Sequence, residues 1–118
     1  MSNYVGIWQR DDVLTVWFHN EMDKPFALGE KMNAICNQAY MNGYNWDAFF
    51  NYYLANRAPE VLNAMQASSP EAGSYVAYFN KEYEQHAGRF VAIIRDLVDN
   101  EEETLRIVRE ENHLIEWD

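Results

Sequence analysis

An aromatic-rich stretch, YMNGYNWDAFFNYY at residues 40–53, places the strongest constraint on the fold. Seven of its fourteen residues are aromatic, three are asparagine and one is charged. Trp46, Phe49, Phe50 and Tyr53 follow the three- and four-residue spacing of one helix face. Aromatic side chains at this spacing predict packing in a core rather than a ligand-binding aromatic box.

Residues 4–18 predict an N-terminal β-hairpin. Two runs rich in β-branched and aromatic residues flank residues 9–12, where clustered charge marks a turn. Both alternating sets of the second run are largely apolar, so we expect this strand to be buried on both faces. The segment SYVAYF, at 74–79, predicts a further strand.

The first helices are predicted to surround the aromatic stretch. An apolar stripe from Leu28 to Tyr40 predicts one helix, after a loop that closes at Pro25. Gly43 is predicted to end it in the left-handed conformation. Asn45 is predicted to cap the next helix.

The second half of the chain predicts more helices around one loop. Pro59 suits the first position of a short helix, and QASSPEAG at 66–73 is rich in turn residues and predicts a loop. Two further helical stripes follow between residues 83 and 108. Residues 114–117 fit either a helix end or a short edge strand.

The predicted order of elements is β-β-α-α-α-β-α-α, which indicates the α+β class. We expect one domain over residues 1–118: a small antiparallel sheet, made of the hairpin and a strand near 74–79, packed with about four or five helices. A hydrophobic content of 48% is enough for one core.

The formal charge of −10, from nineteen acidic and nine basic residues, limits the partners. Nucleic acid and anionic membrane surfaces attract concentrated positive charge, so both are disfavoured. A basic protein is the natural electrostatic complement. An acidic surface that is merely solvated is the alternative.

The negative charge is concentrated in residues 96–118, where nine acids meet two arginines, Arg106 and Arg109. Glu102 and Glu103 have these arginines as helix neighbours. Glu101, Glu110 and Glu111 have fewer cationic neighbours, so we expect them to remain available to a partner. The nine acids are Asp96, Asp99, Glu101, Glu102, Glu103, Glu110, Glu111, Glu116 and Asp118.

These observations define a candidate binding set on the acidic segment. Exposed tyrosines of the aromatic stretch are added as interface anchors, because tyrosine is enriched at binding hot spots. A solvated face with modest ion pairs is the alternative reading of the same charges. The candidate residues are Asp99, Glu101, Glu102, Glu103, Glu110, Glu111, Tyr44 and Tyr52.

No catalytic motif frames the histidines, and we expect no enzyme, no cofactor and no bound metal. Glu82 and His86 have a helical spacing that metal ligands use, but a single pair is a weak signal. The single cysteine, Cys36, lies on an apolar helix stripe and predicts a buried, inert thiol. The first residues lack a basic and then apolar leader, so we expect a cytoplasmic protein.

Three segments give the chain a family resemblance: AYMNGYNWDAFFNYYLANRAPEVL, SSPEAGSYVAYF and the terminal IEWD. Over roughly residues 33–118 the chain resembles the bacterial immunity protein fifty-one family, which is linked to polymorphic toxin and contact-dependent growth inhibition systems. YMNGYxW, at 40–46, and PEAGxYVAY, at 70–78, are its distinctive parts. The N-terminal hairpin adds little to the likeness.

The resemblance implies a non-enzymatic protein that binds a cognate toxin C-terminal domain in the cytoplasm and blocks its active site or substrate access. Many such toxins are nucleases with basic clefts, so the acidic carboxylates would take the places of phosphates. Motif residues shared by proteins with different toxins are expected to be scaffold. A small enzyme using Glu82 or His86 near the aromatic cluster, and an adaptor or oligomerisation domain, remain alternatives; the oligomeric state is left open.

Overall fold

The structure, a computed structural model, describes residues 3–118. A four-stranded sheet and a set of helices form it, in an order that adds one strand to the predicted one. The elements are β1 (Val5–Arg10), β2 (Val13–Phe18), α1 (Asp23–Ile35), α2 (Gly43–Arg57), α3 (Pro59–Ala64), β3 (Met65–Pro70), β4 (Tyr75–Asn80), the 3-10 turn η1 (Lys81–Tyr83), α4 (Glu84–Asp99), α5 (Glu101–Glu111) and the 3-10 turn η2 (Asn112–Leu114).

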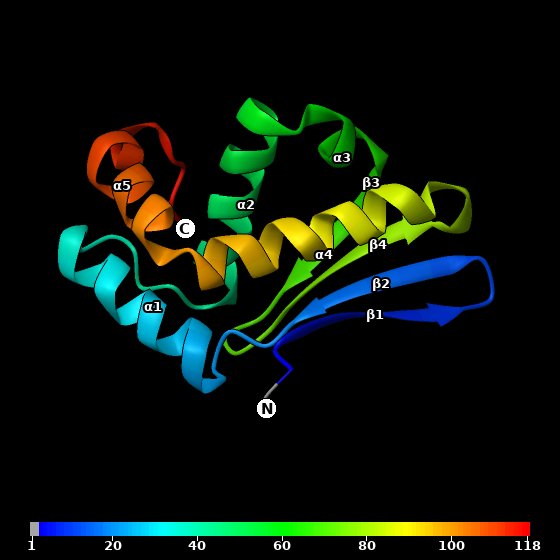
Figure 1. The fold of residues 1–118 in the computed structure, drawn as a ribbon, viewed down its shortest axis with the longest axis horizontal. Helices are drawn as coiled ribbons and strands as arrows, with labels where there is room; N and C mark the ends of the chain where they lie inside the picture. Colours follow the sequence, from blue (N-terminus) through cyan, green and yellow to red (C-terminus); the bar gives the residue numbers. More distant parts are fainter. Residues whose placement is uncertain (1–2) are drawn as a thin grey trace.

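The sheet is antiparallel throughout, with the strand order β1-β2-β4-β3. The helices gather on one side of it, and α4 runs across β1, β2 and β4 (Figure 1). α5 packs on α1 and α4, in a tier further from the strands. The predicted α+β class is confirmed, and so are the N-terminal hairpin and the strand near 74–79.

Strand β2 is buried on one face, so the prediction of two buried faces is wrong. Leu14, Val16 and Phe18 face the helices and are buried. On the other face Val13 is exposed and Trp17 is half-buried. Because the helices cover only one side of the sheet, the apolar residues of β2 that face the other side are not fully buried.

The stretch predicted as a loop at 66–73 contains β3, which pairs antiparallel with β4. Its small polar residues have low strand propensity, but β4 supplies the ladder that holds them extended. A register irregularity lies between Met65 and Ala67, and Pro70 ends the strand at a sheet edge, where a missing N–H is tolerated.

Helix α1 begins earlier and ends earlier than predicted. It starts at Asp23, with Pro25 buried in the first turn rather than closing a loop. Proline is compatible with the first turn because the N–H groups there have no helical partner. The helix ends at Ile35, and the thiol of Cys36, which follows, is buried as predicted.

The turn before α2 differs from the prediction in its cap. Asn42, and not Asn45, is the N-cap residue: its side chain accepts a 2.9 Å hydrogen bond from the backbone N–H of Asn45. The buried Asn45 side chain accepts in return from the N–H of Met41, at 3.0 Å, which resembles a capping box. Met41, with φ 52°, takes the left-handed conformation that was predicted for Gly43.

Gly43 is instead required by a close approach between backbones. Its N–H donates a 2.9 Å bond to the carbonyl of Ala72. A Cβ at this position would lie 1.8 Å from the carbonyl oxygen of Glu71 and 2.3 Å from that of Ser74. The two distinctive family motifs, at 40–46 and 70–78, therefore dock against each other, as expected for scaffold residues.

Interlocked aromatic rings fill the space between sheet and helices. Phe50 of α2 lies at the centre, with ring centroids 5.6 Å from Phe18, 5.1 Å from Tyr75 and 5.5 Å from Phe90. The rings meet edge to face, a geometry that aromatic quadrupoles favour. Trp46 is fully buried beside them, so the predicted core role is confirmed for Trp46, Phe49 and Phe50. It is wrong for Tyr40, which lies beyond the end of α1 and is 72% exposed, and Tyr53 is only partly buried.

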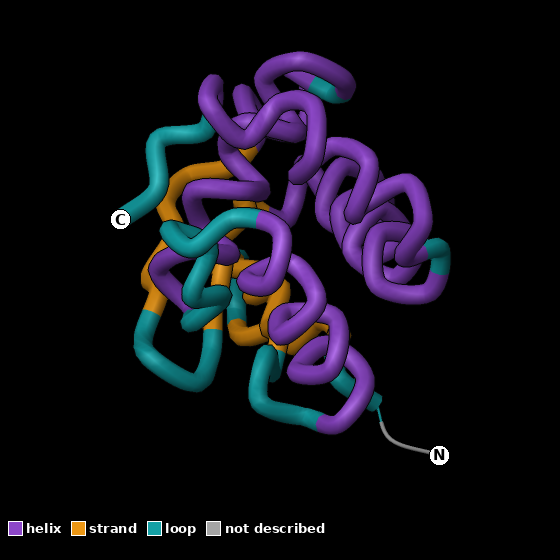
Figure 2. The backbone as a smooth tube through the Cα atoms, turned by 90° about the vertical axis from the view of Figure 1, so that its left-hand side faces the viewer, coloured by secondary structure: helices purple, strands orange, loops and turns teal. Residues whose placement is uncertain are grey.

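The chain ends in η2 and an extended segment, which is neither a helix end nor an edge strand (Figure 2). Figure 2 shows this segment leaving the last helical turn and running down one side of the molecule. No helix within residues 3–118 combines the length and the apolarity that crossing a membrane requires.

Candidate functional site

Helix α5 carries most of the predicted binding residues on its solvent side. Thr104, Ile107 and Val108 are buried against the rest of the protein. Glu101, Glu102 and Glu103 form the first turn, where the positive end of the helix dipole stabilises carboxylates. The burial of one stripe therefore turns the acidic residues outward as a group.

Two of the predicted residues are paired with lysines of α1. Nζ of Lys31 lies 2.6 Å from the Glu101 carboxylate, and Nζ of Lys24 lies 2.6 Å from that of Asp99. Asp99 also accepts a 2.9 Å hydrogen bond from the Tyr4 hydroxyl. The hydrogen bond from Lys24 is the main cause that lowers the pKa of Asp99. Both pairs are half-exposed, so each contributes little to stability.

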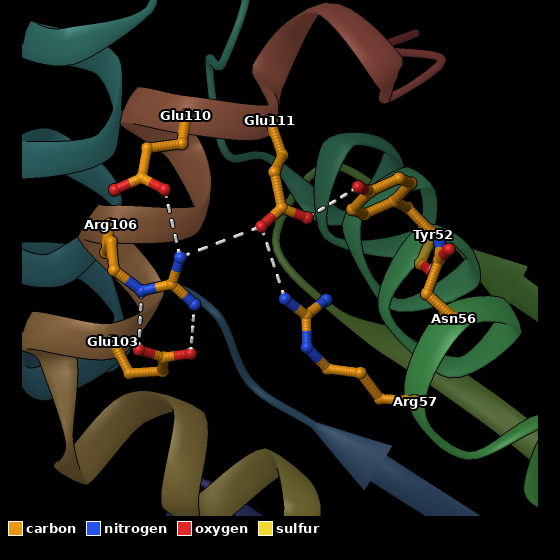
Figure 3. Close-up of polar contacts among 7 residues, drawn as sticks. All are labelled: Tyr52, Asn56, Arg57, Glu103, Arg106, Glu110 and Glu111. Atoms are coloured by element: carbon orange, nitrogen blue, oxygen red, sulfur yellow. Dashed lines mark hydrogen bonds and ion pairs between the residues drawn. The ribbon is translucent and has the colours of Figure 1, made fainter.

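Arg106 is the centre of an ion-pair cluster on α5 (Figure 3). Its guanidinium donates two parallel hydrogen bonds to the Glu103 carboxylate, from Nε at 2.8 Å and from Nη2 at 2.5 Å. Its Nη1 donates to Glu110 at 3.1 Å. The bond from Arg106 lowers the pKa of Glu103. This cluster follows the predicted helix neighbours for Glu103 and adds Glu110, which was expected to be free.

Glu111 joins α5 to α2. It accepts a 2.6 Å hydrogen bond from the Tyr52 hydroxyl and a 3.3 Å bond from Nη2 of Arg57, and its Oε2 lies 3.8 Å from Nη1 of Arg106 (Figure 3). The Tyr52 hydroxyl is the main cause that lowers the pKa of Glu111, and Glu111 raises that of Tyr52. Glu111 is therefore engaged within the protein, whereas the sequence analysis expected it to remain available to a partner.

Glu101, Glu110 and Glu111, which were expected to have fewer cationic neighbours than Glu102 and Glu103, are each ion-paired. Their partners on α1 and α2 are distant in sequence, and Glu110 shares an arginine with Glu103. Of the predicted set, Glu102 is exposed and makes no ion pair within the described chain. Tyr44 is 41% exposed, whereas Tyr52 is engaged with Glu111.

A groove of about 400 Å³ lies beside this cluster, between α2 and the C-terminal segment. It brings together Asp47 of α2 with Glu116 and Asp118 of the chain end. None of these three carboxylates forms an ion pair with another residue of the described 3–118 range. The groove is lined by Tyr44, Asp47, Ala48, Asn51, Tyr52, Ala55, Asn56, Leu114, Glu116, Trp117 and Asp118, none of which is basic.

Asp47 is the least solvated of the three groove carboxylates. It accepts a 2.8 Å hydrogen bond from the hydroxyl of Ser68 on β3. Burial raises its pKa, the Ser68 bond lowers it, and the charge of Asp118 raises it again. An ionised Asp47 therefore has one hydrogen-bond donor and a like charge as neighbours, a setting in which a cation would be stabilised.

Sequence reasoning missed this groove. Glu116 and Asp118 were counted among the acids of 96–118 but were not singled out, and Asp47 entered only as the one charged residue of the aromatic stretch. The useful signal was the absence of Lys or Arg after Arg109. Glu116 and Asp118 have no Lys or Arg three or four residues away, a property that they share with Glu101 and Glu111 of α5.

The residues of the enzyme alternative do not form a site with the aromatic cluster. His86 lies with Gln85 and Arg89 at a small hollow on α4, and its ring is 5.6 Å from that of Tyr83. The rings of Trp46, Phe49 and Phe50 are fully buried. No group of three or more potential metal ligands occurs in the part of the chain that is described.

The fold and these surfaces define a small, acidic α+β protein whose exposed features suit contact with another protein. The model of the family described as Immunity protein 51 matches residues 7–113, and the chain belongs to this family. The match reaches into the N-terminal hairpin, which the resemblance at 33–118 did not include, and it ends before the terminal IEWD, which the resemblance did include. Neither the curated proteins nor the solved structures gave a match to this chain.

Family membership indicates a toxin-neutralising role with a protein toxin as partner. Immunity proteins of this kind are generally not enzymes.

Proposed function

We propose that this chain neutralises the C-terminal domain of a polymorphic toxin, of the contact-dependent growth inhibition type, by binding it in the cytoplasm of the toxin-producing bacterium. The partner surface is basic, as in the substrate cleft of a nuclease. The observation that carries the proposal is the groove between α2 and the chain end, with carboxylates that no basic residue of the described chain neutralises.

The groove offers what a basic side chain of the toxin needs. Asp47, Glu116 and Asp118 provide negative charge, and a Lys or Arg inserted between them would replace their mutual repulsion by attraction. Leu114, 56% exposed, and Tyr44 at the groove can pack on the aliphatic part of that side chain. An aromatic and charged anchor of this type is typical of interface hot spots.

The ion-paired carboxylates of α5 have a different role in this proposal. Glu103, Glu110 and Glu111 share two arginines, Arg57 and Arg106, so their negative charge is only partly neutralised and direct contact with a partner would compete with these ion pairs. Together with the exposed Glu102 they add to the negative field that steers a basic partner towards the groove. The candidate residues Asp99 and Glu101 are each paired with a lysine of α1, so they add little to this field.

The test compares two variants that lose the same charge. The groove variant carries Asp47→Asn, Glu116→Gln and Asp118→Asn; the control carries Glu30→Gln, Glu82→Gln and Glu84→Gln, which replace exposed acids outside the groove. Each is co-expressed with a cognate toxin C-terminal domain, and affinity is measured by calorimetry. We expect at least tenfold weaker binding and lost protection for the groove variant alone, a change of about 1.4 kcal/mol.

If both variants weaken binding equally, the groove acids contribute only through the net charge of the protein. Full protection and unchanged affinity with the groove variant would move the contact surface elsewhere on the protein. An absence of any binding by the wild-type protein would contradict the toxin-neutralising role of this pair. Circular dichroism of both variants verifies that folding persists.

A further inference from the structure

The side of the sheet that faces away from the helices is open. Along each strand alternate residues project to this side, and the helices pack on the other (Figure 1). Strand register places the projecting residues in rows across the sheet, such as Trp8, Thr15, Tyr78 and Ala67. The open face consists of Gly6, Trp8, Arg10, Val13, Thr15, Trp17, Ala67, Ser69, Val76, Tyr78 and Asn80.

Two tryptophans form a broad aromatic surface on this face. Trp8 is 60% exposed, and its ring centroid lies 5.9 Å from that of Trp17 on the neighbouring strand. The Trp17 ring spreads over Gly6, where an added Cβ would lie 2.6 Å from it. Glycine at position 6 thus lets the indole lie close to the strand. The result is a flat, largely apolar area on the exposed side of a sheet, a feature typical of an interaction surface.

Charge distinguishes this face from the rest of the protein. None of the four strands contains Asp or Glu, and Arg10 is their single charged residue. All nineteen acids of the chain therefore lie outside the strands. The acidic cluster is on α5, which packs on α1 and α4 in a tier away from the sheet. The open face is thus the part of the molecule that approaches another acidic body with least repulsion.

We propose that a second copy of this chain covers the open face, so that two sheets pack face to face. A basic toxin gains no attraction from a face without carboxylates, whereas an identical copy brings the same acid-free, aromatic surface. In a two-fold arrangement the same patch meets itself, and face-to-face sheets lie about 10 Å apart with interdigitating side chains. Both helix layers, with their negative charge, then point away from each other.

This arrangement leaves the acidic groove free in both copies, because it lies between α2 and the chain end on the helical side. The dimer does not depend on the proposed toxin binding, and each can be tested without the other. Trp8 and Thr15 lie side by side in the middle row of the face, so a substitution at either position tests whether this face forms the dimer.

The experiment measures mass by sedimentation equilibrium over a wide range of protein concentration. The wild-type protein is expected to approach twice the chain mass of 13.9 kDa at high concentration. Trp8→Ser and Thr15→Glu are each expected to weaken the dimer at least tenfold, whereas Tyr40→Ser is the matched control because Tyr40 is a 72% exposed aromatic residue outside the sheet. Circular dichroism checks the fold of each variant.

Hydrogen exchange of the wild-type protein gives a second measurement that needs no variant. Amides of β1 and β2 are expected to exchange more slowly at high concentration than at low concentration. A mass of one chain at every concentration overturns the proposal, and so does a dimer that both substitutions leave intact. A monomer whose toxin binding is lost in Trp8→Ser would assign the face to the toxin and likewise overturn it.

Discussion

The Tyr52 hydroxyl on α2 donates a 2.6 Å hydrogen bond to Oε1 of Glu111 on α5, across 59 residues of sequence. The same carboxylate accepts from Arg57 through its other oxygen. The acidic helix is thereby tied to the helix that forms one wall of the groove (Figure 3). Stability and the position of the binding surface are linked at this contact.

The Tyr52–Glu111 contact is expected to be energetically coupled. In a double-mutant cycle of Tyr52→Phe and Glu111→Ala, monitored by urea unfolding, we expect a coupling free energy of about 1 kcal/mol, because a partly buried hydrogen bond to a charged acceptor is lost. Glu110→Gln is the control, since it removes one exposed ion pair and should cost at most about 0.5 kcal/mol. A coupling near zero would contradict the contact.

The pH dependence of stability should reflect the same carboxylate. Hydrogen bonding lowers the pKa of Glu111 below its ordinary value of 4.5. The folded state therefore binds fewer protons than the unfolded state in this range, so the stabilisation is present above about pH 4.5 and is lost as pH falls through the folded pKa. The urea midpoint of Glu111→Gln should fall less steeply with acidification than that of the wild type.

Asp47 is expected to affect the pH dependence of stability in the opposite direction to Glu111. Burial raises its pKa in the folded protein, so the ionised form reduces stability at neutral pH and protonation relieves this cost as pH falls. Asp47→Asn should therefore be no less stable than the wild type at neutral pH, as judged from the urea midpoint. A clear loss of stability would indicate that the bond with Ser68 outweighs the cost of burial.

The close docking of the two family motifs against each other is expected to depend on Gly43. Gly43→Ala places a methyl group within 1.8 Å of the Glu71 carbonyl oxygen, and because this neighbour is backbone the 71–74 turn must move. We expect a loss of about 3 kcal/mol or more in the free energy of unfolding. Gly88→Ala is the control: no atom lies within 4 Å of its added Cβ in the middle of α4, so it should gain about 0.5 to 1 kcal/mol.

Toxin binding is expected to depend on ionic strength through its association rate. Because exposed charges steer the encounter and salt screens them over about 8 to 10 Å, added sodium chloride should slow association much more than it speeds dissociation. Stopped-flow or surface-plasmon measurements with the toxin domain separate the two rates. A rate of association that salt leaves unchanged would contradict electrostatic steering.

The sequence by itself determined the features that depend on local periodicity and composition. The alternation in residues 4–18 and the helical stripe through Trp46, Phe49 and Phe50 indicated the hairpin and the core, and the motifs indicated the family. These signals work because side-chain periods of two and 3.6 residues are properties of the backbone itself. The balance of acids and bases predicts a basic partner, and this stays a prediction.

Only the tertiary structure decided which strands and which charges are used. β3 has weak strand propensity and exists because β4 lies beside it. Glu101 and Glu111 are neutralised by Lys31 and Arg57, residues 70 and 54 positions away, whereas the terminal acids meet Asp47 and, among residues 3–118, no cation. Ion pairs and grooves arise between elements brought together by packing, and no local pattern in the chain records those distances.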